Sequence, residues 1–382
     1  MILKKELSYI ITILLISLMM ALGITGCQGQ QEDQVSQEKA SENQEQQEKE
    51  QQEKDQKEQQ EQEKQQEQIT IVDSEGRSVE VPSPPEKVVV ANSNINELLY
   101  ILESEDKTVG VADSITFPPE AQEYPEVGSV FSPNAEKILE LDPDIVFGFG
   151  QYMDQDIKKQ IELADIPVVF LDGYKIETLT QDIRTMGLIM DRESQAEEYI
   201  DFIEGHMQLI TDRIDEIEDE DKVSVYSETQ AEYSAYASGS GAHQALLKAG
   251  GVNLAGNEPG SSVTISDEWI LEQDPDVIVK NLSDRNVAIG YEEDSHDEIT
   301  EELAAMVDRP GWDELTAVNE DRVVGISTDL YTSPRSVVGL SYLAKWFYPE
   351  QFNDVEPKEI HRELLEEYYG LEYQGVWVYP HE

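Results

Sequence analysis

Short apolar runs alternate with amphipathic stretches along most of this chain. In its first half, continuous apolar runs occupy VVVAN (88–92), TVGVAD (108–113), DIVFGFG (144–150) and VVFLD (168–172). Such strands, separated by helical patterns, are typical of a parallel sheet covered by helices on both faces. Just before them, ITIVDSEGRSVEVP (69–82) alternates apolar and polar residues on both sides of a turn, which predicts a β-hairpin.

A long helical pattern then interrupts the strands between residues 177 and 217. After Arg192, apolar residues recur every three or four positions at Ala196, Tyr199, Ile200, Ile203, Met207, Ile210 and Ile214. This part predicts a helix of about 25 residues, roughly 37 Å long at 1.5 Å per residue. A helix of that length can bridge two lobes.

The second half repeats the alternation of strands and helices. Strands are expected at KVSVYSE (222–228), DVIVKN (276–281) and RVVGIS (322–327), with a helix beginning near Ala242 and C-terminal helices over 336–348 and 357–369. The pattern therefore predicts an α/β protein with two Rossmann-like lobes joined by a single long rigid helix. We place the lobes at 69–190 and 219–382 and the helix at 191–218.

Two stretches, EKILELDPDIV (136–146) and EWILEQDPDVI (268–278), share seven of their eleven residues. Each predicts a helix that ends at Asp-Pro before a buried strand, with Ser132 or Thr264 as the N-cap and Pro133 at the first helical position of the first copy. One copy falls in each lobe, so the repeat indicates two pseudo-symmetric halves.

The N-terminus has the layout of a secretory signal. Lys4 and Lys5 precede an apolar run, and residues 24–27 read ITGC. This ending resembles a lipobox, which would make Cys27 the lipidated first residue of the mature chain; an ordinary signal with a chance cysteine is the alternative. Because Cys27 is the only cysteine, the chain has no disulfide, thiolate nucleophile or cysteine metal site.

Residues 28–68 consist almost entirely of Gln, Glu and Lys, with no aromatic residue. Such a segment cannot bury enough surface to offset chain entropy, so we expect a disordered tether rather than a coiled coil. Its span would be roughly 35 Å. The protein is then predicted to be extracytoplasmic and lipid-anchored to the outer face of the cell membrane.

The formal net charge of −54 narrows the set of partners. Residues 69–382 hold 20 basic and 67 acidic residues. This excess of acids argues against nucleic-acid binding and against adhesion to anionic lipid. We therefore expect that only the lipid anchor contacts the membrane. Self-repulsion of this size is tolerable where salt screens it, which favours a saline or alkaline habitat. Compositional drift is the alternative.

Several motifs together resemble a known family, the lipoprotein substrate-binding components of ABC importers for iron-siderophore, haem and cobalamin. They are DSEGRSVEVPSPPEKVV (73–89), the paired helices above, GGVNLA (250–255) and VNEDRVVGI (318–326). The resemblance implies the helical-backbone periplasmic-binding-protein fold, a ligand in the cleft and little hinge motion. It also implies an ABC permease dimer with its ATPase as partner. The resemblance further implies that one exposed glutamate per lobe docks on permease arginines, and these glutamates match Glu136 and Glu268. Favourable contact with the helix dipole is the alternative explanation for both.

Ligand-binding residues are expected beyond the carboxyl ends of the strands, because clefts in open α/β lobes lie there. Tyrosine has a flat apolar ring with a polar hydroxyl, and the guanidinium of arginine binds anionic oxygens through two hydrogen bonds. Candidates of these two types suit a large polar chelate. Structural ion pairs and core packing are the alternatives for these side chains. The helix that SGSGAH (238–243) opens could also receive an anion. The candidates are Asn92, Asn94, Tyr152, Met153, Tyr233, Tyr236, Arg285, Tyr331 and Arg335.

Among functions, the sequence favours capture of an iron(III)-siderophore-type chelate, with Arg335 as a main contact, followed by a corrinoid such as cobalamin. Haem is a further alternative, with Tyr233, Tyr236 or His243 as its axial ligand. A zinc or manganese binder is disfavoured because no histidine falls in the first lobe. A secreted enzyme is the remote alternative, since no nucleophile elbow, metalloprotease helix or phosphate loop is present. We expect a monomer with no cofactor and no resident metal.

Overall fold

The computed structural model describes residues 67–380. The predicted signal, Cys27 and the tether up to Gln66 lie outside the described residues. The first element is the hairpin of β1 (Glu67–Val72) and β2 (Ser78–Ser83), which pair antiparallel as predicted. Strand β1 begins two residues earlier than Ile69, because Glu67 and Gln68 pair with Ser83 and Pro82.

The N-terminal lobe is built on a four-stranded sheet in the order β4-β3-β5-β6. All of its strand pairs are parallel, which confirms the prediction from the apolar runs. The strands are β3 (Val88–Val90), β4 (Thr108–Val111), β5 (Ile145–Gly148) and β6 (Val168–Phe170), and the helices that follow them are α3 (Ser93–Ile101), α4 (Ala135–Leu141) and α5 (Gln155–Glu162).

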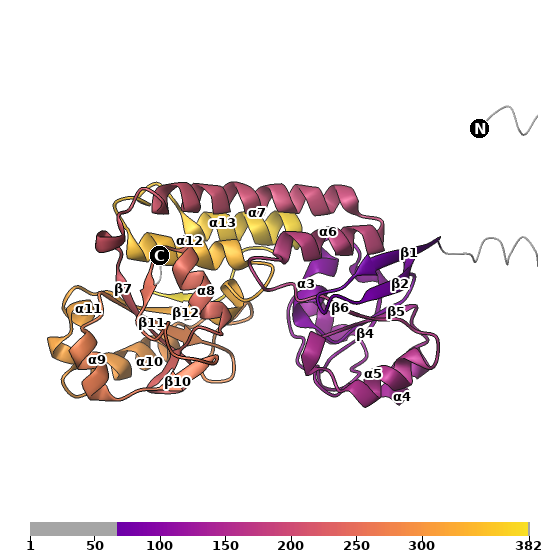
Figure 1. Ribbon diagram of the computed structural model, residues 1–382, viewed down its shortest axis with the longest axis horizontal. Coiled ribbons are helices and arrows are strands. Elements are labelled where there is room, and N and C mark those ends of the chain that lie inside the picture. The colour runs from indigo at the N-terminus through magenta and orange to yellow at the C-terminus, as the bar shows by residue number, and fades with distance from the viewer. Residues whose placement is uncertain (1–66, 381–382) are drawn as a thin grey trace, which may run out of the picture. The chain divides into compact units, whose positions relative to one another are not determined.

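The long helical stretch is two helices, α6 (Leu179–Met190) and α7 (Glu193–Ile214). They are separated at Asp191, whose φ of 57° is left-handed and ends α6. Helix α7 has 22 residues, about 33 Å at 1.5 Å per residue, and extends over both lobes (Figure 1). Six of the seven apolar positions predicted for its inner face are buried, and Met207 is partly buried.

The C-terminal lobe contains a mixed sheet in which β7 (Ser224–Glu228), β11 (Val277–Leu282) and β12 (Val323–Ser327) are the predicted parallel strands. Short strands of two or three residues surround them, and these escape detection because no periodicity can be read in so few positions. They are the antiparallel β8 (Ser234–Tyr236), β10 (Ser262–Thr264) and β13 (Val378–Tyr379), and β9 (Val252–Asn253), which pairs parallel with β7.

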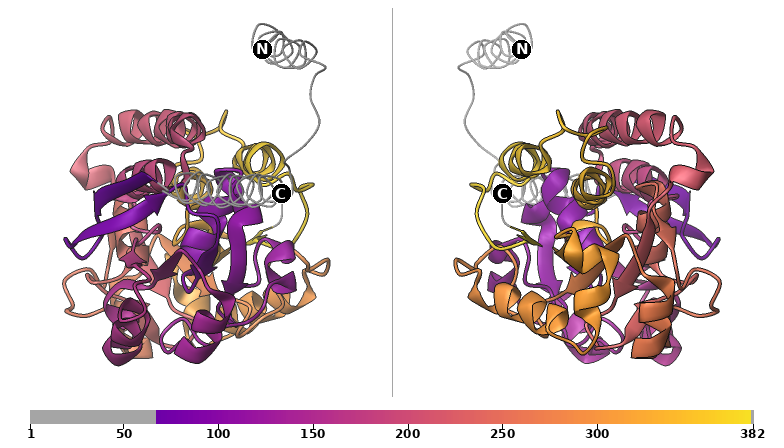
Figure 2. Two further views of the ribbon diagram at one scale, coloured as in Figure 1. Left: turned by 90° about the vertical axis from the view of Figure 1, so that its right-hand side faces the viewer. Right: turned by 90° about the vertical axis from the view of Figure 1, so that its left-hand side faces the viewer.

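The helices of this lobe are α8 (Gly241–Lys248), α9 (Asp267–Gln273), α10 (Asp297–Val307) and α11 (Thr316–Asn319). At the C-terminus, α12 (Ser336–Phe347) and α13 (Pro357–Glu363), the latter continued by a π-turn over Leu364–Tyr368, lie beneath α7. The end views place this helical layer on one side of both sheets (Figure 2).

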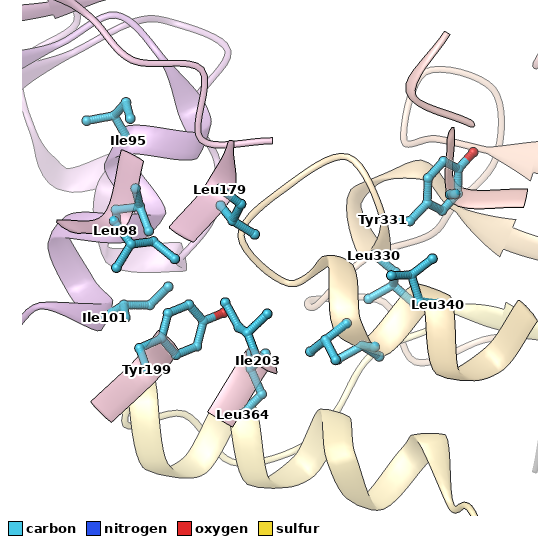
Figure 3. Packing of buried hydrophobic residues seen from close by; sticks show 14 of the residues in the cluster. Ile95, Leu98, Ile101, Leu179, Tyr199, Ile203, Leu330, Tyr331, Leu340 and Leu364 are labelled. Atoms are coloured by element: carbon cyan, nitrogen blue, oxygen red, sulfur yellow. The ribbon is translucent and has the colours of Figure 1, made fainter. Parts of the chain in front are cut away.

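One hydrophobic core runs through both lobes by way of this helical layer (Figure 3). Leu98 of α3 lies in the same cluster as Tyr199 of α7 and Leu340 of α12. The buried hydroxyl of Tyr199 donates a hydrogen bond to the carbonyl of Pro334, 2.9 Å away. The lobes therefore share a continuous packed layer, which favours a stiff connection between them.

The repeated stretches form α4 and α9, but their N-caps are Asn134 and Ser266. The predictions of Ser132 and Thr264 are wrong by two residues, and Pro133 stands before the helix rather than at its first position. In the second copy, Thr264 is taken by β10. Both helices end as predicted at Asp-Pro, where Asp142 and Asp274 adopt left-handed φ values of 51° and 43°.

Candidate functional site

A cavity of about 800 Å³ is lined by residues of both lobes. Its wall in the N-terminal lobe combines polar residues with five aromatic ones, which are Phe117, Phe131, Phe149, Tyr152 and Tyr174. Its wall in the C-terminal lobe is polar and includes Gln230, Ser283, Asp284, Arg285, Thr328 and Asp329. A concave cleft that combines aromatic surface with convergent polar groups is a common form of small-molecule site.

Four of the aromatic side chains form a continuous row, which we call the aromatic wall: Phe131, Phe149, Tyr152 and Tyr174. The ring of Phe149 stacks on both tyrosines, with centroid distances of 5.2 Å to Tyr152 and 5.9 Å to Tyr174. Phe131 meets Tyr152 edge-on at 6.2 Å. Phe131 and Tyr152 are each 52% exposed, so large apolar faces are open to the cavity.

The chain positions this wall at the carboxyl ends of two adjacent strands. Phe149 and Tyr152 follow β5, where Gly150 has a φ of 39°, a conformation that favours glycine and turns the chain sharply. Tyr174 follows β6. Tyr152 is the only member that the sequence analysis named, although the same strand-end rule could have found Phe149 and Tyr174.

Arg335 lies in the cavity wall but is paired with Glu97, and both side chains are almost completely buried. Its Nε and Nη2 donate to the Glu97 carboxylate at 2.8 and 3.2 Å, and the hydroxyl of Tyr369 donates to the same group at 2.7 Å. The guanidinium carbon lies 4.2 Å from the ring centroid of Phe117 and 5.3 Å from that of Trp377. We call the Glu97–Arg335 pair the interlobe pair.

The interlobe pair connects α3 of the first lobe with the start of α12 in the second. Burial raises the pKa of the Glu97 carboxyl, an effect that the charge of Arg335 and the hydrogen bond from Tyr369 oppose. Glu97 was missed by sequence reasoning, because nothing distinguishes it from the many other acids of this chain. Arg335 was predicted to contact ligand, yet two of its guanidinium nitrogens are bonded to protein.

Of the other predicted ligand residues, Asn94 and Arg285 lie in the cavity wall. The Asn92 side chain is buried instead, where it caps α3 and donates a hydrogen bond to the carbonyl of Leu171. Tyr331 is 2% exposed, and its hydroxyl donates to the side chain of Asn281. Asn92 and Tyr331 therefore have structural contacts away from the cavity.

The remaining tyrosine candidates also lie off the cavity wall. The ring of Tyr233 is covered by the guanidinium of Arg309 at 4.6 Å, and Tyr236 packs against the core. Met153 is 1% exposed and belongs to a core cluster. The haem candidate His243 contacts the side chain of Asn253 at 3.1 Å. Helix α8, opened by SGSGAH, does reach the cavity through Gly241.

No group of three or more His, Cys, Asp or Glu side chains within residues 67–380 is arranged to hold a metal ion. The fully buried His361 instead packs edge-on against Trp377 and Tyr373, at 4.9 and 5.4 Å. Burial lowers the pKa of His361 well below 6.5, and the charge of Arg335 adds to this effect.

His361 should make stability depend on pH. Its pKa is lower in the folded than in the unfolded chain, so the unfolded chain binds the proton first as the pH falls below about 6.5. We expect the free energy of unfolding to fall by up to about 1.4 kcal/mol per pH unit from this group. Urea unfolding at pH 7.5 and 5.5 measures it, and a His361→Phe variant with an unchanged pH slope would contradict the assignment.

The two glutamates predicted to dock on a permease are both exposed in the first turns of their helices, Glu136 on α4 and Glu268 on α9. Two hydrogen bonds lower the pKa of the Glu268 carboxyl. The larger effect comes from its own backbone amide and the smaller from the side chain of Ser266. Helices α4 and α9 both lie on the side of the molecule opposite α7 (Figure 1). Each lobe therefore carries one such helix on this side, with an exposed glutamate in its first turn.

Comparison with known proteins gives one family match, to the periplasmic binding protein model over residues 88–330. The substrate-binding lipoprotein YvrC of an ABC transporter from Bacillus subtilis is 27% identical over 293 residues, 75% of this chain and 87% of that protein. The cobalamin-binding protein of Halobacterium salinarum is 26% identical over 220 residues, 56% of this chain and 59% of that protein.

Solved structures share the fold. The TroA-like periplasmic binding protein FepB from Veillonella parvula has a TM-score of 0.70 at 24% identity, over 81% of this chain and 99% of that one. The molybdate-binding protein MolA of Haemophilus influenzae, bound to molybdate, has a TM-score of 0.67 at 21% identity, over 80% and 99%.

Within the described part of the chain, no helix has both the length and the apolar character needed to cross a membrane. The family match covers well over half of the 382 residues, and the two-lobed fold with its ligand-sized cleft agrees with it. The chain belongs to the periplasmic binding protein family and is the extracytoplasmic substrate-binding component of an ABC importer, not an enzyme.

Proposed function

We propose that this protein captures a large metal chelate with a flat apolar face, a corrinoid in the first place, and delivers it to its permease. The observation that carries the proposal is the aromatic wall facing a polar wall across a cavity of about 800 Å³. Aromatic faces give large contact areas at little cost in conformational entropy, and polar groups opposite them fix the orientation of the ligand.

Exposure of the wall supports this function. Phe131 and Tyr152 are among the few large apolar side chains that are more than half exposed within residues 67–380. Their rings contact each other edge-on. Exposed apolar patches in a cleft mark a binding surface. A corrinoid ring presents a matching flat surface, and a relative in Halobacterium salinarum is a cobalamin-binding protein.

An iron(III)-siderophore-type chelate is the second candidate. The sequence favoured it because Arg335 was expected to bind the anionic oxygens of the chelate. In the structure, the guanidinium of Arg335 instead donates two hydrogen bonds to the Glu97 carboxylate. Arg285 remains exposed on the opposite wall and could contact a chelate oxygen. Haem is less well supported, because Tyr233, Tyr236 and His243 do not line the cavity; among the described residues, the tyrosines that do are Tyr152 and Tyr174.

Isothermal titration of the purified protein decides between these ligands. Cyanocobalamin, a ferric trihydroxamate and haemin are titrated separately under the same conditions. We expect cyanocobalamin to bind with a Kd of about 1 μM or below. Binding of the trihydroxamate or haemin with no detectable heat from cyanocobalamin would overturn the corrinoid assignment.

We further propose that Cys27 carries the lipid anchor and that Glu136 and Glu268 dock on the two halves of the permease dimer. A symmetric dimer presents two equivalent sockets, and the repeat supplies two equivalent acids. The double variant Glu136→Lys with Glu268→Lys is expected to abolish uptake of labelled ligand by intact cells while ligand binding by the purified protein stays unchanged.

The repeat also supplies the matched control for docking. Glu140 and Glu272 are exposed glutamates one turn further along the same helices. Replacing both with lysine changes the net charge by the same amount as the docking variant, on the same two helices. Equal loss of uptake in both double variants would show that overall charge, rather than docking by Glu136 and Glu268, is responsible.

A further inference from the structure

We propose that the cleft selects its ligand by charge, admitting neutral or cationic chelates and excluding polyanionic ones, with Asp329 as the residue that decides. The inference rests on the proposed function only in taking the cavity between the lobes as the ligand site. It does not depend on whether the ligand is a corrinoid or an iron chelate.

The charged residues in the cavity wall are few. They are Glu97, Asp284, Arg285, Asp329 and Arg335. In the interlobe pair, Glu97 balances the charge of Arg335 through two hydrogen bonds, and aromatic rings of Phe117 and Trp377 lie near its guanidinium. A ligand anion therefore meets no uncompensated arginine at that position.

Three charged residues remain, two acids and one arginine. Asp284 and Arg285 follow β11, and Asp329 follows β12. Because β11 and β12 are parallel neighbours in the sheet, their carboxyl ends bring these side chains to the same edge of the cleft. The net formal charge of this edge is negative.

The backbone holds Asp329 in place. Its amide donates to the Ser327 hydroxyl at 3.4 Å, and its carbonyl accepts a hydrogen bond from the Ser333 hydroxyl at 2.5 Å. The Asp329 side chain is exposed in the cavity wall, so it can meet a ligand directly. Desolvation raises the pKa of its carboxyl and Arg335 lowers it, while the neighbouring Asp284 raises it and Arg285 lowers it. The excess of acids at this edge of the cleft would repel a ligand that carries several negative charges.

The interlobe pair leaves no free guanidinium for an anionic ligand. The Nη1 atom of Arg335 is buried, so a ligand in the cavity cannot reach it. Other side chains of the wall, among them Asn94, Gln230 and Thr332, supply neutral donors that suit neutral oxygen groups such as amides. A polyanion would also need cations to replace its hydration, and among the described lining residues Arg285 is the one cation besides the paired Arg335.

The test compares three ferric chelates of similar size that differ in charge, together with molybdate as a small oxyanion. The full chain is titrated with a neutral ferric trihydroxamate, a cationic ferric trihydroxamate that bears a free ammonium group, a trianionic ferric tricatecholate, and molybdate. We expect the neutral and cationic complexes to bind about tenfold or more tightly than the tricatecholate, and molybdate not to bind. Tightest binding of the tricatecholate, or tight binding of molybdate, would overturn the inference.

Asp329→Asn is the decisive variant, since it removes one charge and keeps the shape of the side chain. The ratio of cationic to tricatecholate affinity should fall by about tenfold, with the thermal unfolding midpoint unchanged. Asp201→Asn, at an exposed position on α7, makes the same change in net charge outside the cavity wall and should leave the ratio unaltered. An equal effect of both variants, or no effect of Asp329→Asn, would refute the role of Asp329.

The outcomes separate this inference from the proposed function. If cyanocobalamin fails to bind while the charge ratio behaves as described, the corrinoid assignment fails and the charge selection stands. If cyanocobalamin binds and Asp329→Asn leaves the charge ratio unchanged, only the charge selection fails.

Discussion

Glu97→Ala is expected to lower the free energy of unfolding by about 3–5 kcal/mol, because it leaves the guanidinium of Arg335 buried without its counter-ion. Glu97 is 4% exposed and Arg335 1% exposed, so water cannot replace the lost partner. Urea unfolding at pH 7.5 measures the change. Since the pair joins the two lobes, we also expect proteolysis of the native protein to accelerate.

Two control variants make this prediction specific. In the double variant Glu97→Leu with Arg335→Met, both charges are replaced by apolar groups of similar volume, and most of the stability should return. The ion pair between Arg213 and Asp354 also joins distant parts of the chain, but Asp354 is 64% exposed. Asp354→Ala should therefore have a much smaller effect than Glu97→Ala. Equal losses in the two single variants would show that burial of the interlobe pair is unimportant.

Phe149→Ala is expected to weaken binding of the ligand that titration identifies by about tenfold or more, roughly 1.4 kcal/mol. Phe149 stacks on Tyr152 and on Tyr174, so its removal frees both rings as well as deleting a contact surface. Double-sided stacking makes it the central residue of the aromatic wall. Isothermal titration of the variant against the wild-type protein measures the loss.

Leu163→Ala is the matched control for this variant. Leu163 is 76% exposed on the same lobe, at the end of α5, and is not part of the cavity wall. It should leave both affinity and thermal midpoint unchanged. A Phe149→Ala variant with wild-type affinity would remove the aromatic wall from the binding site, and with it the observation that carries the proposed function.

Much of the fold could be predicted from the sequence because it depends on local periodicity. Apolar runs that are buried on both faces mark β3, β5 and β11, and three-and-four spacing marks the inner face of α7. The short strands β8 and β10 were missed, since three residues carry no measurable period. The predicted N-caps of α4 and α9 were each two residues too early, because several polar residues near the start of each helix can act as an N-cap.

The candidate site was predicted in part, by the rule that ligand residues follow strand ends. Three residues that the rule selected, Asn94, Tyr152 and Arg285, line the cavity, and their contact with ligand stays a prediction. The rule also selected Tyr331, whose side chain turns into the protein and bonds to Asn281. The direction of a side chain after a strand depends on packing with neighbouring elements, which the rule does not contain.

The sequence by itself determined the two lobes, the long helix and the repeated acidic helices, because each depends on residues that are close together along the chain. Only the tertiary structure decided the pairing of Glu97 with Arg335, which lie 238 positions apart. The same is true of the aromatic wall and of the acids beside Arg285. Contacts between lobes depend on how two separately patterned halves pack against each other, and no local pattern records which of many acids a buried arginine will meet.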